Sequence, residues 1–194
     1  VMLSSGLSGT YNMVRIQAEQ QKELEVAVFD SKSGALGLGV TILQLWEEIQ
    51  AGTGWEELVE HRAPFLIANT FPFFSVDTLE YLYKGGRIGK VTAMAGSLLQ
   101  IKPIITFAGD GQLQSTAKVR GRKQLLDKFV ELVGVCAKGR SGRYNIAVAN
   151  GGAPEQMALL REKMRAAFPD YVHCWEGALD ATLSVYIGDG VVGA

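Results

Sequence analysis

The sequence has few of the residues that build disulfide frameworks or metal centres. It contains two cysteines, Cys136 and Cys174, and two histidines, His61 and His173, in 194 residues. The cysteines are far apart and lack the spacing of a redox or metal motif, which argues against a disulfide scaffold. The histidines do not have the spacing of a zinc-binding motif, and a zinc site would need further nitrogen or sulfur ligands. We therefore expect no bound metal, and the cysteine usage indicates a reduced, cytoplasmic compartment.

Neither sign of charge dominates the chain, and long apolar runs are missing. Nineteen basic and twenty acidic residues give a net charge of -1. This balance argues against a nucleic-acid-binding surface or a polybasic membrane patch. No apolar run is long enough to span a bilayer, and the first residues lack the pattern of a signal peptide. With 47% hydrophobic and 20% charged residues, the composition is that of an ordinary globular protein.

Glycine is abundant, at 23 residues, and the elements between the glycine-rich turns alternate in type. Helical spacing of apolar residues predicts helices at 11–20, 37–51, 55–62, 77–82, 94–99, 122–135 and 154–168. Short apolar runs predict strands at 25–29, 64–69, 101–107, 112–119, 144–149, 171–175 and 183–187. The turn sequence at 108–111 is typical of a hairpin. This order predicts an α/β fold with a domain boundary near Arg62.

A segment rich in serine and glycine, SSGLSGTY at residues 4–11, precedes the first predicted helix. The first backbone N–H groups of a helix have no intrahelical partner and lie at the positive end of the helix dipole. The hydroxyls of Ser8 and Thr10 lie beside them in the sequence, with Gly9 between. This combination predicts a site for a carboxylate or a phosphate. Neither histidine can be placed near Ser8 as a base, so we expect a ligand-binding hydroxyl and no catalytic residue.

Two other glycine-rich segments resemble nucleotide-binding loops but depart from them. Residues 34–39 lack the third glycine or alanine of a dinucleotide loop, because Ile42 stands there. Residues 85–90 lack the first glycine of a phosphate-binding loop, and Val91 replaces its magnesium-binding hydroxyl. We therefore expect no nucleotide cofactor. Close packing at a strand–helix turn explains the first segment, and a helix stop explains Gly85 and Gly86.

Basic residues remain at two places without a local explanation. Arg87 follows the helix stop, and Arg120, Arg122 and Lys123 open a helix, where cations oppose the helix dipole. A solvated cluster and a contact site for an acidic partner are both compatible with this pattern. The turn at 186–190 is either an ordinary surface turn or a second anion site.

These segments together resemble the DegV family of bacterial lipid-binding proteins, which includes the fatty-acid-binding subunits of fatty acid kinase. The matching segments are residues 4–11, 77–90, 101–104 with the following hairpin, 118–124 and, less closely, 184–194. The resemblance implies a two-domain α/β fold. The first domain, at 1–62, would hold part of a parallel sheet, and the second, at 63–194, a mixed or antiparallel sheet.

The resemblance also implies a long-chain fatty acid bound between the two domains, with hydroxyls and a histidine on its carboxylate. Ser8 corresponds to one of those hydroxyls, with Gly9 and Thr10 beside it, whereas Tyr186 stands in place of the histidine. A phenol donates one hydrogen bond but carries no positive charge. Asp189 adds a negative charge nearby, which disfavours a bound carboxylate.

A separate kinase subunit is the partner that the resemblance implies, so the chain itself is expected to be a carrier and not an enzyme. Arg87, Arg120 and Arg122 are candidates for docking this partner or for screening the acyl phosphate. A receptor or enzyme for a small carboxylated or phosphorylated ligand at the same loop is the alternative. Family members begin with a further strand and loop, so we expect a chain that lacks the start of its first domain and exposes a sheet edge.

Overall fold

The computed structural model describes residues 1–94, 101–140 and 142–194, and these form two compact units. Unit 1 comprises residues 1–70 together with 107–112, and unit 2 comprises residues 71–106 and 113–194. The units therefore change over at residue 70, eight residues after the boundary expected at residue 62. Compact units need not coincide with the domains of a family, so the domain limits 1–62 and 63–194 stay a prediction.

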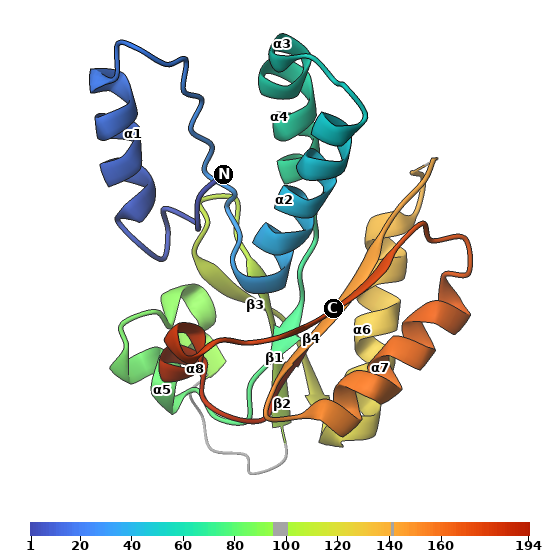
Figure 1. Cartoon of the computed structure of the whole chain (residues 1–194). Coiled ribbons are helices and arrows are strands. Elements are labelled where there is room, and N and C mark those ends of the chain that lie inside the picture. Colours follow the sequence, from blue (N-terminus) through green and yellow to red (C-terminus); the bar gives the residue numbers. More distant parts are fainter. Residues whose placement is uncertain (95–100, 141) are drawn as a thin grey trace. The chain divides into compact units, whose positions relative to one another are not determined.

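Unit 1 consists mainly of helices (Figure 1). These are α1 (Thr10–Gln20), α2 (Ala35–Gln50), α3 (Trp55–Glu57), the π-helix η1 (Leu58–Arg62) and α4 (Ala63–Ala68). In the described part of this unit, the extended segments meet in one isolated parallel bridge, between Met2 and Asp30. Residues 107–112 form a tight turn, in which the Ala108 N–H donates to the Gln112 carbonyl at 2.8 Å. Part of unit 1 thus comes from a segment far along the sequence.

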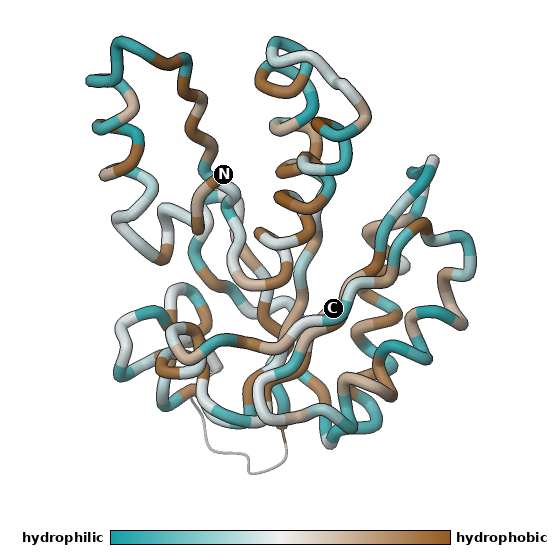
Figure 2. Tube along the Cα trace, viewed as in Figure 1, coloured by the Kyte–Doolittle hydropathy of each residue, from teal (hydrophilic) through white to brown (hydrophobic). Residues whose placement is uncertain are grey.

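Helix α2 of unit 1 contains many hydrophobic residues along its length, as Figure 2 shows. Ile42, Leu43, Trp46 and Ile49 are nevertheless exposed, whereas the buried residues of α2 are Gly37 and Thr41. The helix α1 has no buried residue. All residues of the described hydrophobic core cluster belong to unit 2.

Unit 2 contains a mixed sheet of six strands in the order β3-β2-β1-β6-β4-β5. The strands are β1 (Phe74–Ser75), β2 (Ile101–Phe107), β3 (Leu113–Arg120), β4 (Ile146–Gly151), β5 (Cys174–Ala178) and β6 (Val191–Gly193). Strand β1 pairs antiparallel with β2 and β6, β6 pairs antiparallel with β4, and β4 pairs parallel with β5. In the parallel pair, Ile146 lies opposite Cys174 and Asn150 opposite Ala178.

Helices α6 (Gly121–Ala137) and α7 (Pro154–Ala167) pack on this sheet (Figure 1). The strands contribute Ile104, Ile146, Val148 and Val192 to the core cluster; the helices contribute Leu125, Leu126, Phe129, Leu160 and Met164. Burying a side chain of this size contributes roughly 1.5–3 kcal/mol. The remaining helices of unit 2 are α5 (Glu80–Lys84), the 3₁₀ helix η2 (Gly89–Met94) and α8 (Ala181–Ile187). The α/β class expected from the sequence is confirmed.

Three predicted strands differ from the structure. In the run predicted as a strand at 64–69, residues 64–68 are helical, because Pro64 occupies the first turn of α4 and the π-helix continues directly into it. Residues 183–187 belong to α8, since the Asp180 carboxylate caps this helix by accepting from the Leu183 N–H at 2.9 Å. Residues 25–29 form no named strand, because no neighbouring ladder pairs with them in the described part of the chain.

The other predicted elements agree with the structure to within a few residues, except for one predicted helix that lies outside the described residues. The predicted helix at 94–99 falls largely on residues 95–100, which lie outside the described residues. Strand β5 begins three residues later than predicted, at Cys174. Over the described residues, no helix has the length and apolar character needed to cross a membrane.

Candidate functional site

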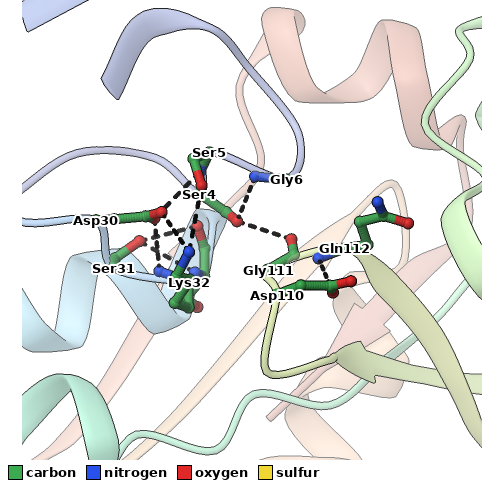
Figure 3. Close-up of polar contacts among 10 residues, drawn as sticks. Ser4, Ser5, Gly6, Asp30, Ser31, Lys32, Asp110, Gly111 and Gln112 are labelled. Carbon is green, nitrogen blue, oxygen red and sulfur yellow. Dashed lines mark hydrogen bonds and ion pairs between the residues drawn. The ribbon is translucent and has the colours of Figure 1, made fainter. Parts of the chain in front are cut away.

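The serine- and glycine-rich loop before α1 is held by the tight turn at 107–112 (Figure 3). Ser4 is fully buried, and its hydroxyl donates to the Gly111 carbonyl at 2.7 Å while accepting from the Gly6 N–H at 3.2 Å. Gly6 lies so close to Gly111 that a Cβ at position 6 would overlap the Gly111 backbone. The loop therefore depends on glycine at position 6 and on a partner segment more than one hundred residues away.

Asp30 holds the same loop from the other side (Figure 3). One carboxylate oxygen accepts from the backbone N–H groups of Ser5 at 3.1 Å and Lys32 at 3.0 Å, and the other is 2.8 Å from the Lys32 ammonium. Burial raises the pKa of Asp30, but the hydrogen bonds from Lys32 and Ser5 together outweigh it, so the pKa lies below its ordinary value. The ionised carboxylate is thus the form that fixes the loop.

The loop brings the two predicted hydroxyls together at the start of α1. Ser8 Oγ and Thr10 Oγ1 are 2.8 Å apart, and the Thr10 N–H donates to Ser8 Oγ at 3.3 Å. The Ser8 N–H itself donates to the Ser4 carbonyl at 3.1 Å. Gly9, the exposed residue between them, accepts the first helical hydrogen bond, from the Met13 N–H at 3.0 Å.

The N–H groups of Tyr11 and Asn12 consequently precede the hydrogen-bonded ladder of α1 and have no intrahelical acceptor. They point along the same helix end as the hydroxyls of Ser8 and Thr10. One hydroxyl proton is used in the Ser8–Thr10 hydrogen bond, so three donors at the positive end of an eleven-residue helix can hold an anionic oxygen pair. This geometry agrees with the anion-binding role predicted for Ser8, Gly9 and Thr10, which remains a prediction because no ligand tests it.

Tyr186, the other predicted head-group residue, lies on α8 in unit 2. Its ring packs against the Gly85 backbone, where a Cβ would come within 2.5 Å of the ring carbon Cδ1. The guanidinium of Arg87 lies over the ring, 4.8 Å from its centre, and Arg87 also donates to the Gly85 carbonyl at 2.7 Å. The structure thus brings Tyr186 together with Arg87, which the sequence assigns to a different role.

Arg122, a candidate for partner docking, belongs to a charged group on unit 2. Its guanidinium lies 3.0 Å from the Asp77 carboxylate, which also pairs with the Lys102 ammonium at 2.7 Å, and it contacts Gln156. Two cations around one carboxylate leave a net positive charge on this surface. Arg120 directly precedes α6 and is exposed, and its N–H donates to the Gln124 side chain at 3.2 Å. Docking through these residues remains a prediction.

Metal and thiol chemistry find little support in the described part of the molecule. Among residues 1–94, 101–140 and 142–194, no three His, Cys, Asp or Glu side chains group in a way that could hold a metal ion. Cys136 and Cys174 are free thiols, and burial raises the pKa of each. A raised pKa keeps a thiol protonated, and therefore a poor nucleophile, at neutral pH.

Sequence reasoning missed the residues that support the serine- and glycine-rich loop before α1. A signal was present for Asp30, because aspartate at the end of an apolar run often binds backbone N–H groups two residues on. No local signal exists for Gly111, since its contact with Ser4 spans 107 positions.

These observations define a two-unit α/β chain with a serine- and glycine-rich loop at a helix start. The model of the DegV family of uncharacterised proteins matches residues 1–194. A DegV domain-containing protein of Clostridium perfringens is 35% identical over 193 residues, which cover all of this chain and 67% of the relative. The chain belongs to the DegV family and spans about two thirds of the length of these relatives.

Solved structures of the family show the same fold. A fatty-acid-binding DegV family protein from Thermus thermophilus is 29% identical, with a TM-score of 0.90 over 98% of this chain and 67% of that protein. A DegV family protein from Eubacterium eligens, solved with heptadecanoic acid, is 26% identical, with a TM-score of 0.84 over 98% of this chain and 69% of that protein. The two-domain DegV-like fold expected from the sequence is therefore confirmed at the level of its mixed α/β architecture.

Proposed function

We propose that this chain is a cytoplasmic carrier that binds one long-chain fatty acid and is not itself an enzyme. The observation that carries the proposal is the similarity to the Thermus thermophilus protein, whose structure was solved as that of a fatty-acid-binding protein. The fatty acid bound by the Eubacterium eligens relative supports the same ligand class. The loop before α1 supplies what a carboxylate head group needs, independently of any relative.

The head group would accept hydrogen bonds from the hydroxyls of Ser8 and Thr10 and from the first N–H groups of α1. The positive end of the helix dipole adds up to about 1 kcal/mol for a negative charge near the helix start. We assign Tyr186 the donor role of the family histidine. Because its phenol supplies no positive charge, the helix end and its donors must provide most of the stabilisation of the carboxylate.

The acyl chain would supply most of the affinity. Each buried CH₂ contributes roughly 0.8 kcal/mol, so a long chain contributes on the order of 10 kcal/mol before the costs of ordering and desolvation. The head-group contacts then orient the ligand. The chain would present the carboxylate to a separate kinase subunit, with Arg87, Arg120 and Arg122 as docking or acyl-phosphate-screening residues.

Lipid content and Ser8→Ala test the carrier role. We expect purified protein to carry fatty acid in native mass spectrometry, and Ser8→Ala to bind a labelled fatty acid about fivefold to tenfold less tightly, since one hydrogen bond to a charged group is lost. Thr53→Ala, which removes a hydroxyl from the loop after α2 in the same unit, is the matched control. Protein that neither carries nor takes up fatty acid would contradict the proposal.

The alternative is a small carboxylated or phosphorylated ligand, because the proposed donors of the loop would donate to an anionic oxygen whatever is attached to it. A thermal-shift comparison of oleate and palmitate with phosphorylated metabolites separates the two possibilities. Greater stabilisation by the phosphorylated compounds would favour the alternative.

A further inference from the structure

Unit 2 contains a cavity that the proposed function does not use. Its volume is about 310 Å³, and its lining residues come from the carboxyl ends of β4 and β5, from α8 and from α5. The lining comprises Tyr81, Asn150, Gly151, Gly152, Ala178, Leu179, Ser184, Gly188 and Asp189. A volume of this size is at the small end of the range for ligand pockets.

The topology explains why a cavity forms here. Strands β4 and β5 are parallel, and their last paired residues are Asn150 and Ala178. Beyond this pair the chain continues into α7 from one strand and into α8 from the other, so the two connections diverge. The carboxyl ends of parallel strands are the usual place for a ligand in an α/β sheet. Asn150 is one of the lining residues; its side-chain oxygen accepts from the Ala153 N–H at 3.1 Å, and the residue is 9% exposed.

One carboxylate is fixed at the cavity wall. Asp189 lies against the backbone of Gly152, where its oxygen occupies the space that a Cβ at position 152 would need. Gly152 also has a φ of +74°, a conformation that residues with a side chain rarely adopt. A side chain at position 152 would therefore both be strained and displace the Asp189 carboxylate. Asp189 itself is exposed to solvent.

The other polar side chains of the wall carry no charge, and the Asn150 amide N–H donates to Met157 Sδ at 3.1 Å. The Ser184 hydroxyl donates its proton to the Asp180 carbonyl at 2.8 Å, so it presents only lone pairs to the cavity. The Tyr81 ring packs on Gly188 and provides an aromatic wall, with Leu179 as an aliphatic one. No lysine, arginine or histidine is among the described residues that line the cavity. The one charged side chain among these lining residues is therefore the Asp189 carboxylate.

We propose that this cavity binds a small organic cation, a protonated primary amine with a short hydrocarbon chain. The ammonium group donates to the Asp189 carboxylate and to Ser184 Oγ, and the Tyr81 ring attracts the same charge through its face. The hydrocarbon part packs against Leu179. The proposal uses none of the proposed head-group residues Ser8, Thr10 and Tyr186, although Ser184 and Asp189 flank Tyr186 in the sequence.

Three probes of one length test the charge that the cavity selects. Butylammonium, butyrate and butanol are titrated separately into the full chain, and binding is followed by isothermal calorimetry and by backbone amide NMR shifts. We expect saturable binding of butylammonium, with shifts at residues 150–152, 184 and 188–189, and no saturable shifts of these cavity residues with butyrate or butanol. Equal responses to all three probes, or none to butylammonium, would overturn the proposal and leave Asp189 only the role of an anion near the start of α7.

Two variants test the residues. Asp189→Asn keeps the shape of the side chain and removes its charge, so we expect butylammonium affinity to fall about tenfold or more. Asp170→Asn, which removes the same charge from an exposed position before β5, at the other end of that strand, is the matched control and should bind like the parent. Tyr81→Leu keeps the charge and should weaken binding severalfold. Undiminished binding by a folded Asp189→Asn variant would contradict the proposal.

Discussion

The guanidinium of Arg87 lies 4.8 Å from the centre of the Tyr186 ring, which also packs against Gly85. Such a cation over an aromatic ring contributes about 0.5–1 kcal/mol at an exposed site. The contact joins a residue predicted to dock a partner to one predicted to hold a head group. A substitution that removes the whole Tyr186 ring would therefore disturb both roles, and the tests of position 186 must keep a ring.

Tyr186→Phe keeps the ring and the contact with Arg87 but removes the hydroxyl. If the hydroxyl donates to the carboxylate, fatty-acid affinity falls about fivefold to tenfold while the melting temperature changes little. Displacement of a fluorescent fatty acid measures the affinity. Tyr83→Phe, which removes a hydroxyl from an exposed tyrosine of α5, is the control. Equal affinities of the two variants would remove Tyr186 from the site.

Tyr186→His restores the residue that the family resemblance leads us to expect. An imidazole can donate a hydrogen bond and can also carry a positive charge, so we expect tighter fatty-acid binding, and a larger gain at pH 6 than at pH 8. The same displacement measurement at the two pH values provides the comparison. Absence of any gain means that the phenol is an adequate donor or that position 186 does not contact the head group.

Gly6→Ala tests how strongly the loop depends on the turn at 107–112. A methyl group at position 6 would overlap the Gly111 backbone, which cannot move as a flexible side chain would. We expect a loss of about 1–3 kcal/mol in the free energy of unfolding, together with weaker fatty-acid binding. Chemical denaturation measures the first effect. Gly39→Ala, in α2 with no atom within 4 Å of the new methyl group, should instead leave stability unchanged or raise it.

Asp30→Asn should destabilise the protein in a pH-dependent way. The pKa of Asp30 is lowered in the folded state, so its contribution to stability is present above the ordinary Asp pKa, about 3.9, and is lost as the pH falls below that value. At pH 7 we expect the variant to be less stable by about 1–3 kcal/mol, and the difference should shrink towards pH 3. Urea unfolding across this range measures it. Asp170→Asn, at an exposed position, should show no such convergence.

Arg120→Gln and Arg122→Gln test the proposed docking of a kinase subunit. We expect each variant to bind fatty acid normally but to lower the rate of acyl-phosphate formation by the host's kinase subunit, with the loss concentrated in kcat/KM at low salt. Lys163→Gln, which removes a cation of α7 that pairs with Asp127, is the control. A loss that matches the control variant would show that only the overall charge matters.

The sequence predicted those elements whose conformation is decided by residues close together in the chain. The hairpin of β2 and β3 follows from the glycine-rich turn at 108–111, and the start of α1 follows from the loop containing Ser8 and Thr10. Strands β1 and β6 were missed because two or three residues, Phe74–Ser75 and Val191–Gly193, carry no periodicity. Their pairing with longer neighbours makes them strands.

Other errors arose where one side chain or one distant segment decided the outcome. The run from Leu183 to Ile187 is rich in residues that favour strands, but the cap from Asp180 makes it helical. The candidate site shows the same division. Ser8 and Thr10 could be found from their spacing, whereas the support from Gly111 depends on a contact that only the folded chain makes.

The hydrogen bond from Ser4 to Gly111 makes unit 1 discontinuous along the polypeptide. During synthesis, the loop before α1 leaves the ribosome long before its supporting turn exists. That loop can acquire its final conformation only after residues 107–112 have emerged, so we expect unit 1 to mature late although most of it precedes unit 2 in the sequence. For the same reason, a fragment ending at residue 70 would be an unsuitable starting point for dissecting the protein, since it would leave the buried Ser4 hydroxyl without its acceptor.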